Sequence, residues 1–393
     1  MVTGLTIGDM ISRMPPTAPL AGFRVVDLTN GLAGTSCTKF LSSYGADVIK
    51  IENPDGGDMT RNLVPWVFET FNGGKRSLTV DLREKSGQDT VRRLATSSDV
   101  LVQSMRPGAL EEIGLGRAEL TAANPRLIYA SFSAFGSSGP SSHRRGVDPV
   151  VQAESGLAEI VGRVMDNVSV IDAAGGLALA QGVLAALMLR ERSGIAEHVE
   201  VNLLDTAVYL QAALYTEFSA TGRTLDQDSF DEMFPTVGTF EAQDGPLYIA
   251  AYWQRDWATI CDLVGRPELV EDARFCDAAS RSANRDALRE GINAELKRRP
   301  RREWVGELER LGILAGERRS YAEVLADEQV QHNETFEAIQ LADDRSVSIP
   351  RSPVRLGGRP LPSLGAAPAL GQHTDSILLS LQDLAPSGAA RGR

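Results

Sequence analysis

The sequence predicts an α/β fold with two domains, and three observations lead to this prediction. Short apolar runs alternate with glycine-containing loops and helical stretches, which is the order typical of a parallel sheet. The chain has 393 residues, more than a single domain usually holds. After about Thr221 the loops lengthen and charged helices replace the apolar runs. We therefore expect a large domain over residues 1–222, a small α+β domain over residues 223–325, and a return to the large domain over residues 326–393.

The first part of the chain reads as strand, loop, helix and strand. Residues 23–28 are predicted to form a buried strand, residues 35–44 a helix, and residues 45–51 the next strand. The loop between them, Asn30-Gly-Leu-Ala-Gly34, lacks the G-x-G-x-x-G pattern of dinucleotide-binding folds. No stretch of the sequence matches the phosphate-binding pattern G-x-x-x-x-G-K-[ST] either. The sequence therefore gives little support to a nicotinamide-dependent dehydrogenase.

Further strands and helices follow in the same order. Strands are predicted at residues 78–82, 99–103, 127–132 and 198–202, and helices at residues 85–95 and 203–214. The strand at 99–103 runs into Ser104-Met-Arg-Pro-Gly108. Because ligands of open α/β sheets bind at the carboxyl ends of the strands, this loop is a candidate binding segment. In the small domain we expect a hairpin around Gln243-Asp-Gly245 and helices at residues 255–264, 283–298 and 302–311.

Composition narrows the class of function. The formal net charge of -12 argues against general affinity for nucleic acids or anionic membranes. The three cysteines and four histidines show no metal-ligand spacing, and they favour a reducing cytoplasm over a disulfide framework. Residues 1–21 lack the pattern of a signal peptide. Residues 173–189 are apolar, but they are too few and too interrupted to cross a membrane, so we expect a buried helix there.

One carboxylate stands at a distinctive position. The β-branched run at residues 168–172 ends at Asp172, two alanines and two glycines follow, and residues 177–189 have a strong helical pattern. Read as strand, turn and helix, this pattern places Asp172 at a helix N-terminus. Asp172 could be an N-cap residue, or it could be a nucleophile whose ionised form the helix favours. In the second case Gly175 and Gly176 would offer backbone N–H groups to an oxyanion. These residues alone favour the N-cap.

Many segments, taken in order, resemble the class III CoA-transferase family, which includes formyl-CoA and carnitine CoA-transferases and α-methylacyl-CoA racemase. The matching segments are residues 20–28, 45–52, 72–77, 99–102, 106–108, 114–116, 124–131, 136–140, 146–148, 172–176, 203–205, 265–269 and 322–327. The resemblance covers nearly the whole chain. It implies a Rossmann-like large domain with a smaller inserted α+β domain, and an interlocked homodimer.

The resemblance also implies a mechanism and a site. Asp172 becomes the nucleophile that carries the acyl group and then CoA, with coenzyme A as substrate and no tightly bound cofactor. The family's CoA contacts fall at Asn30, Gly31, Leu32, Val80, Arg83, Ser104, Met105 and Arg106. Arg144 and Arg145 are either further phosphate contacts or a solvated surface pair. Leu32 and Asn53 replace a glutamine and an arginine of the formyl-CoA enzyme, which does not favour formate or oxalate as substrate.

Other functions stay open. The racemase branch carries a Gly-His-Asp motif where this chain has Gly146-Val147-Asp148, and valine cannot transfer a proton. His143 is close to this motif but out of register, and Asp148 is either a second site carboxylate or a loop cap. Intramolecular CoA transfer and a non-catalytic CoA-binding protein are further alternatives. The acyl pocket is expected near residues 134–142 and Tyr252, with Trp253 and Trp257 as pocket or core residues.

Overall fold

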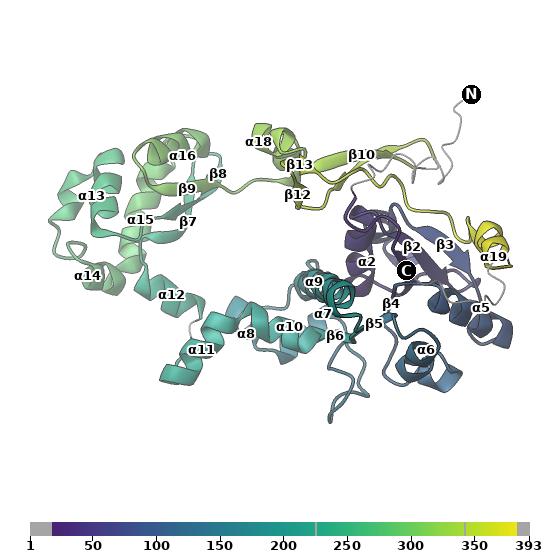
Figure 1. Ribbon diagram of the computed structural model, residues 1–393. Helices are drawn as coiled ribbons and strands as arrows, with labels where there is room; N and C mark the ends of the chain where they lie inside the picture. Colours follow the sequence, from purple (N-terminus) through teal and green to yellow (C-terminus); the bar gives the residue numbers. More distant parts are fainter. Residues whose placement is uncertain (1–17, 225, 342, 383–393) are drawn as a thin grey trace. The chain divides into compact units, whose positions relative to one another are not determined.

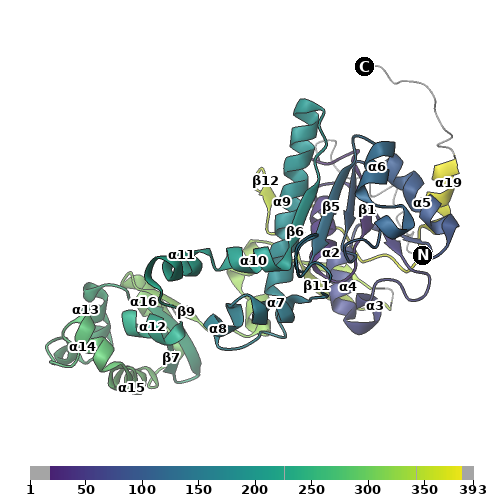
Figure 2. The ribbon, with the colours of Figure 1, turned by 90° about the horizontal axis from the view of Figure 1, so that it is seen from below.

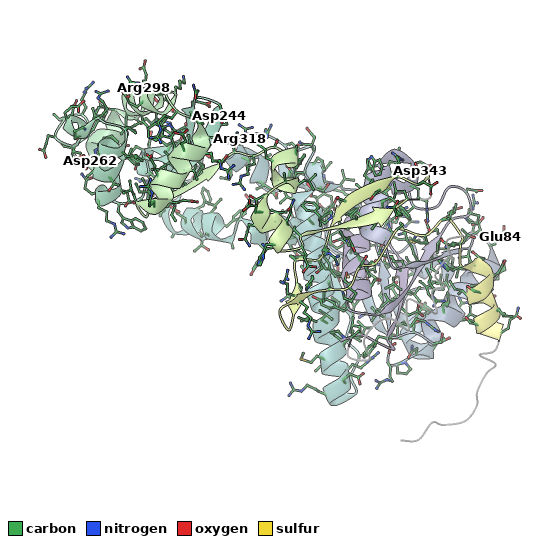
Figure 3. All side chains as sticks on the ribbon, turned by 90° about the horizontal axis from the view of Figure 1, so that it is seen from above. Glu84, Asp244, Asp262, Arg298, Arg318 and Asp343 are labelled. Atoms are coloured by element: carbon green, nitrogen blue, oxygen red, sulfur yellow. The ribbon has the colours of Figure 1, made fainter. Side chains whose placement is uncertain are left out.

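A computed structural model describes residues 18–224, 226–341 and 343–382, and its contacts divide the chain into two compact units. Within the described ranges, the larger unit holds residues 18–158, 164–211 and 332–382, and the smaller unit holds residues 159–163 and 212–331. Figure 3 labels Glu84 and Asp343 on the larger unit and Asp244, Asp262, Arg298 and Arg318 on the smaller one. Each unit is described by itself.

The larger unit is built on a parallel sheet of six strands in the order β3-β2-β1-β4-β5-β6 (Figure 1). The strands are β1 (Arg24–Leu28), β2 (Asp47–Glu52), β3 (Arg76–Thr79), β4 (Val100–Gln103), β5 (Ile128–Ser133) and β6 (Val199–Asn202). Every neighbouring pair is parallel. The predicted parallel α/β architecture is therefore confirmed for this unit.

Helices cover both faces of this sheet, which explains why its strands read as continuous apolar runs. Two consecutive residues of β1 show the two faces, because Val25 packs into one core and Val26 into the other. The core on the Val25 side includes residues of α2 (Ala33–Ser43), α7 (Asp148–Glu154), α9 (Val170–Ser193) and α10 (Leu203–Leu210). The core on the Val26 side includes residues of α5 (Lys85–Thr96), α6 (Arg117–Ala123) and α19 (Thr374–Gln382).

The strand expected at residues 168–172 is wrong, because α9 already begins at Val170. Ile171 is fully buried in the core, and tertiary packing of this helix outweighs the β propensity of a short β-branched run. Figure 2 shows the long helix α9 beside β5 and β6.

The expectation that residues 173–189 are too few to cross a membrane is corrected by the length of α9, which has 24 residues. Among the described residues, α9 is the helix that is long and apolar enough to cross a membrane. Leu179 and Val183 are fully buried, which a core helix explains.

The remaining described elements of the larger unit are short. They are α3 (Thr60–Leu63), α4 (Pro65–Asn72), η1 (Glu111–Ile113), β10 (Phe336–Gln340), β11 (Ser346–Pro350), β12 (Arg355–Leu356) and β13 (Arg359–Pro360). The strands β10 and β11 form one antiparallel hairpin and β12 and β13 another. Two helices, α8 (Leu157–Val161) and α18 (Glu328–His332), extend across the division between the units.

The smaller unit contains an antiparallel sheet of β7 (Val237–Ala242), β8 (Gly245–Ala250) and β9 (Leu314–Glu317). The hairpin predicted around Gln243-Asp-Gly245 is confirmed as β7–β8. Its helices and turns are α11 (Ala212–Thr221), α12 (Gln227–Met233), α13 (Gln254–Leu263), η2 (Pro267–Val270), α14 (Ala278–Ala283), α15 (Arg285–Leu296), α16 (Arg301–Arg310) and α17 (Tyr321–Leu325). Trp257 is a core residue with 1% exposure, whereas Trp253 is 56% exposed.

Candidate active site

The carboxyl ends of the parallel strands form one edge of the sheet, and the strand order reverses between β1 and β4. A reversal of this kind opens a crevice in which α/β proteins bind ligands. Asn30 follows β1 and Ser104 follows β4, and the Asn30 backbone N–H donates to Ser104 Oγ over 3.0 Å. The structure thus brings together the two candidate segments 30–32 and 104–106 at the reversal point.

Helix α9 brings Asp172 to the same edge. Because α9 leads into the parallel strand β6, its N-terminus lies at the carboxyl edge of the sheet. A methyl group on Gly176 would lie 2.6 Å from the backbone oxygen of Ala33, in the first turn of α2. Asp172 is one helical turn before Gly176 on the same face of α9. It therefore lies at the edge where α2 begins, directly after residues 30–32.

The structure corrects the role expected for the two glycines. Gly175 and Gly176 lie inside α9, where helix geometry commits their N–H groups to the carbonyl groups four residues earlier. They are not free to donate to an oxyanion. A methyl group on Gly175 would lie 2.8 Å from the Phe132 ring, so the absence of side chains lets α9 approach β5 and α2 closely. Their function here is packing.

The helix cap expected at Asp172 is also wrong. Asp172 lies in the first turn of α9, and Ser169 occupies the N-cap position without a side-chain hydrogen bond. Asp148, at the start of α7, supplies the cap instead. Its Oδ2 accepts the backbone N–H of Ile171 over 2.7 Å and that of Asp172 over 2.8 Å. The Asp172 carboxylate is therefore not used to cap its own helix.

The environment of Asp172 raises its pKa to about 7. Burial is the larger cause, because it disfavours the charged carboxylate, and the nearby negative charge of Asp148 adds to it. Protonated and ionised forms of Asp172 therefore coexist near neutral pH. A carboxylate with a strongly raised pKa at the ligand-binding edge of an α/β sheet is a candidate for chemistry.

This pKa sets an expected pH dependence. If Asp172 must be ionised to react, kcat/KM should be constant above about pH 8 and fall about tenfold per unit below about pH 6. Initial rates measured between pH 5 and 9 give the pH dependence of kcat/KM. Aliquots returned from each pH to pH 8 must recover full activity, so that denaturation is separated from titration. A rate that stays constant down to pH 5 would contradict this role of Asp172.

Sequence reasoning missed a buried ionic network beneath the loop between β1 and α2. Lys75 Nζ lies 2.9 Å from Asp27 Oδ2 and Lys50 Nζ lies 2.8 Å from Asp58 Oδ2, and all four side chains are fully buried. Lys50 also donates to the Thr29 carbonyl over 3.0 Å, and Lys75 donates to the Thr35 carbonyl over 3.1 Å. The lysines thus hold the first residue of the loop and the first turn of the helix that follows it. In the sequence, the feature that could have indicated this network was Asp27, a charged residue inside an apolar strand.

Three candidate arginines follow strands at the same edge, and each forms an ion pair with a carboxylate. Arg83 follows β3, which is separated from β1 by β2, and it pairs with Asp81 and Asp55. Arg106 pairs with Glu112 over 2.6 Å, and Arg144 donates to Glu154 over 2.9 Å. All three guanidinium groups are exposed, and exposed ion pairs are weak enough to exchange for a phosphate.

The uncharged candidate residues are described by their backbone, and Arg145 by its exposure. The Val80 backbone N–H donates to the Glu52 carbonyl over 3.0 Å, and the Met105 N–H donates to Gln103 Oε1 over 2.7 Å. Gly31 has a φ of 83°, a left-handed conformation that suits glycine. Arg145 is exposed in the segment before α7. Among the described residues, no group of three or more His, Cys, Asp or Glu side chains is arranged to hold a metal ion.

Comparison with known proteins decides the family. The family model described as CoA-transferase family III matches residues 20–374. The chain belongs to this family. A protein of Mycobacterium tuberculosis named probable fatty acyl-CoA transferase is 34% identical to this CoA-transferase over 92% of this chain and 98% of its own. The acetyl-CoA:oxalate CoA-transferase of Acetobacter aceti is 34% identical over 87% of this chain and 90% of its own.

Solved structures agree with the family. The crystal structure of a CAIB/BAIF family protein from Brucella suis matches this CoA-transferase with a TM-score of 0.85 and 31% identity. The match covers 93% of this chain and 99% of the Brucella chain. The enzyme is therefore a class III CoA-transferase with the α/β fold of its family.

Proposed function

We propose that this enzyme moves CoA from an acyl-CoA to a carboxylic acid through covalent intermediates on Asp172. The observation that carries the proposal is the position of Asp172, a carboxylate free of helix capping at the edge where the β1 and β4 loops meet. Its raised pKa makes it more basic than an ordinary aspartate and leaves a substantial ionised fraction at neutral pH. Both properties suit a nucleophile.

Four exchanges complete the reaction. An Asp172 oxygen attacks the thioester carbon of the donor, and the CoA thiolate leaves, which forms a mixed anhydride. The thiolate attacks the aspartyl carbonyl and releases the donor acid, which forms an aspartyl-CoA thioester. The acceptor carboxylate attacks this thioester and expels the thiolate again, which forms a second anhydride. The thiolate then attacks the acceptor carbonyl, which releases the new acyl-CoA and the Asp172 carboxylate.

Residues around the sheet edge would bind the CoA part of the substrate. We assign Asn30, Gly31, Leu32, Val80, Ser104 and Met105 to the CoA surface by their position along this edge. Arg83, Arg106, Arg144 and Arg145 would meet the phosphate groups, with the first three exchanging their present carboxylate partners for phosphate. Coenzyme A enters as a substrate, and the mechanism requires no metal or redox cofactor.

Relatives suggest the range of acyl groups. Their names include a fatty acyl-CoA transferase, an acetyl-CoA:oxalate CoA-transferase and succinyl-CoA:glutarate CoA-transferases. We propose an acyl-CoA donor and a carboxylic acid acceptor, in the cytoplasm, in a homodimer. Large exposed apolar side chains on the larger unit support the homodimer, because a partner could cover them. They include Met188 of α9 and Tyr209 of α10, which are 64% and 80% exposed.

A trapping experiment tests the proposal. The enzyme is incubated with a panel of acyl-CoAs that covers short, long and dicarboxylic acyl groups, and then with hydroxylamine. Peptide mass spectrometry should find the hydroxamate on Asp172, and the reactive acyl-CoAs identify the donor class. An enzyme that binds CoA but yields no adduct on Asp172 with any donor would contradict the covalent mechanism.

A further inference from the structure

The first turn of α9 is held by a carboxylate from another helix. Asp148 of α7 is 1% exposed, and its Oδ2 accepts two consecutive N–H groups of α9, those of Ile171 and Asp172. We propose that Asp148 is a positioning residue, which fixes the backbone of Asp172 and thereby the direction of the reacting carboxylate. This inference rests on the proposed function, because it concerns the same nucleophile.

The other oxygen of Asp148 is held in turn. Its Oδ1 accepts Gln152 Nε2 over 2.5 Å, and Gln152 is fully buried. Gln152 Oε1 accepts the backbone N–H of Met165 over 2.8 Å, and its Nε2 lies 3.3 Å from the Met165 carbonyl oxygen. Both the start of α9 and the segment that precedes it are therefore tied to α7. Asp148 itself has no freedom to move away.

This arrangement acts on the side chain through the backbone. Asp172 lies in the first turn of α9, where helix geometry sets φ, so holding its N–H group in place also holds the direction of its Cα–Cβ bond. A nucleophile must meet the thioester carbon at about 3 Å and at a set angle, and a misplacement of about 1 Å can cost about 10²-fold in rate. A buried double hydrogen bond to the backbone of the nucleophile provides that precision.

The charge of Asp148 adds a signature that a purely structural cap would lack. The elements packed on α9 include α2, α7, α10, β5 and β6. Their charged residues are Lys39, Asp148, Glu154, Asp205 and Glu200. Of these, Asp148 is the residue whose charge raises the pKa of Asp172. Removal of this negative charge lowers the pKa of Asp172, so the acid limb of the pH–rate profile should move to lower pH.

The test is Asp148→Asn, which keeps the size of the side chain and removes its charge. We expect kcat to fall about 10- to 100-fold, KM for acyl-CoA to change less than about threefold, and the acid limb to move to lower pH. Asp166→Asn is the matched control, because it removes an exposed carboxylate from the segment before α9. Its kcat and profile should equal those of the wild type.

A second variant covers the case in which Asp148→Asn does not fold, which circular dichroism reports. Gln152→Met removes the hydrogen bond to Asp148 Oδ1 and the two contacts with Met165, but leaves the two bonds from Asp148 to α9. We expect kcat to fall severalfold with little change in KM. A folded Asp148→Asn enzyme with wild-type kcat and pH profile would overturn the proposal, as would an unchanged kcat in Gln152→Met when Asp148→Asn is unfolded. Wild-type turnover without a trapped Asp172 would instead count against the proposed function.

Discussion

Replacement of Asp172 with alanine should abolish CoA transfer. We expect kcat to fall by at least about 10⁴-fold, because the variant has no group that can form the anhydride and the aspartyl thioester. The dissociation constant for CoA should change less than about threefold, since the proposed CoA contacts lie on the segments after β1, β3, β4 and β5. Steady-state transfer assays and calorimetric titration with CoA measure the two quantities.

Two further measurements separate the loss of the nucleophile from indirect effects of the substitution. The control Asp166→Asn should transfer CoA at the wild-type rate, which shows that loss of one negative charge near α9 is not the cause. The alanine variant should also be at least as stable as the wild type at pH 8, because a buried ionised carboxylate with a raised pKa opposes folding above that pKa. Substantial turnover by Asp172→Ala would remove Asp172 from the mechanism.

Replacement of Lys75 with methionine should destabilise the larger unit by about 3–5 kcal/mol. Lys75 and Asp27 are both fully buried, so the variant leaves the Asp27 carboxylate without its nearest positive charge. Burial alone would raise the pKa of Asp27, and the charges of Lys75 and Lys50 hold it well below its usual range instead. The variant also loses the bond to the Thr35 carbonyl, so the loop before α2 should loosen. Urea unfolding measures the stability.

An exposed lysine provides the control for this variant. Lys85 pairs with Asp89, and its side chain is 71% exposed. Lys85→Met should therefore change the free energy of unfolding by less than about 1 kcal/mol. The double variant Asp27→Asn/Lys75→Met should recover part of the loss, because no buried charge is then left unpaired. Equal stability of Lys75→Met and Lys85→Met would show that the buried pair contributes nothing.

The parallel sheet was predictable because each buried strand carries its signal locally. The run before Thr29 and the run before Asn53 are apolar and β-branched, and each is bounded by glycine-containing loops. The carboxyl edge of the sheet followed from the order of strands and helices. The loop at residues 104–106 could therefore be named as a candidate binding segment, whereas residues 30–32 were named only through the family resemblance. The hydrogen bond between Asn30 and Ser104 joins the two segments.

The local structure around Asp172 was not predictable in the same way. Its β-branched neighbours favour a strand, but packing against α2 and β5 makes them the first turn of a helix. The two glycines suggested free N–H groups, and the close approach of Ala33 and Phe132 shows that they are there for packing. Each of these outcomes depends on residues that are distant in the sequence.

Sequence alone determined the α/β class, the family resemblance and the choice of Asp172, because these depend on local patterns and on motifs in order. Tertiary structure alone decided which carboxylate caps α9 and which charged side chains pair with one another. Asp148 reaches α9 from 24 positions away, and Lys75 reaches Asp27 from 48. Hydrogen bonds and buried ion pairs form between groups that folding brings together, so no periodicity or spacing in the chain encodes them.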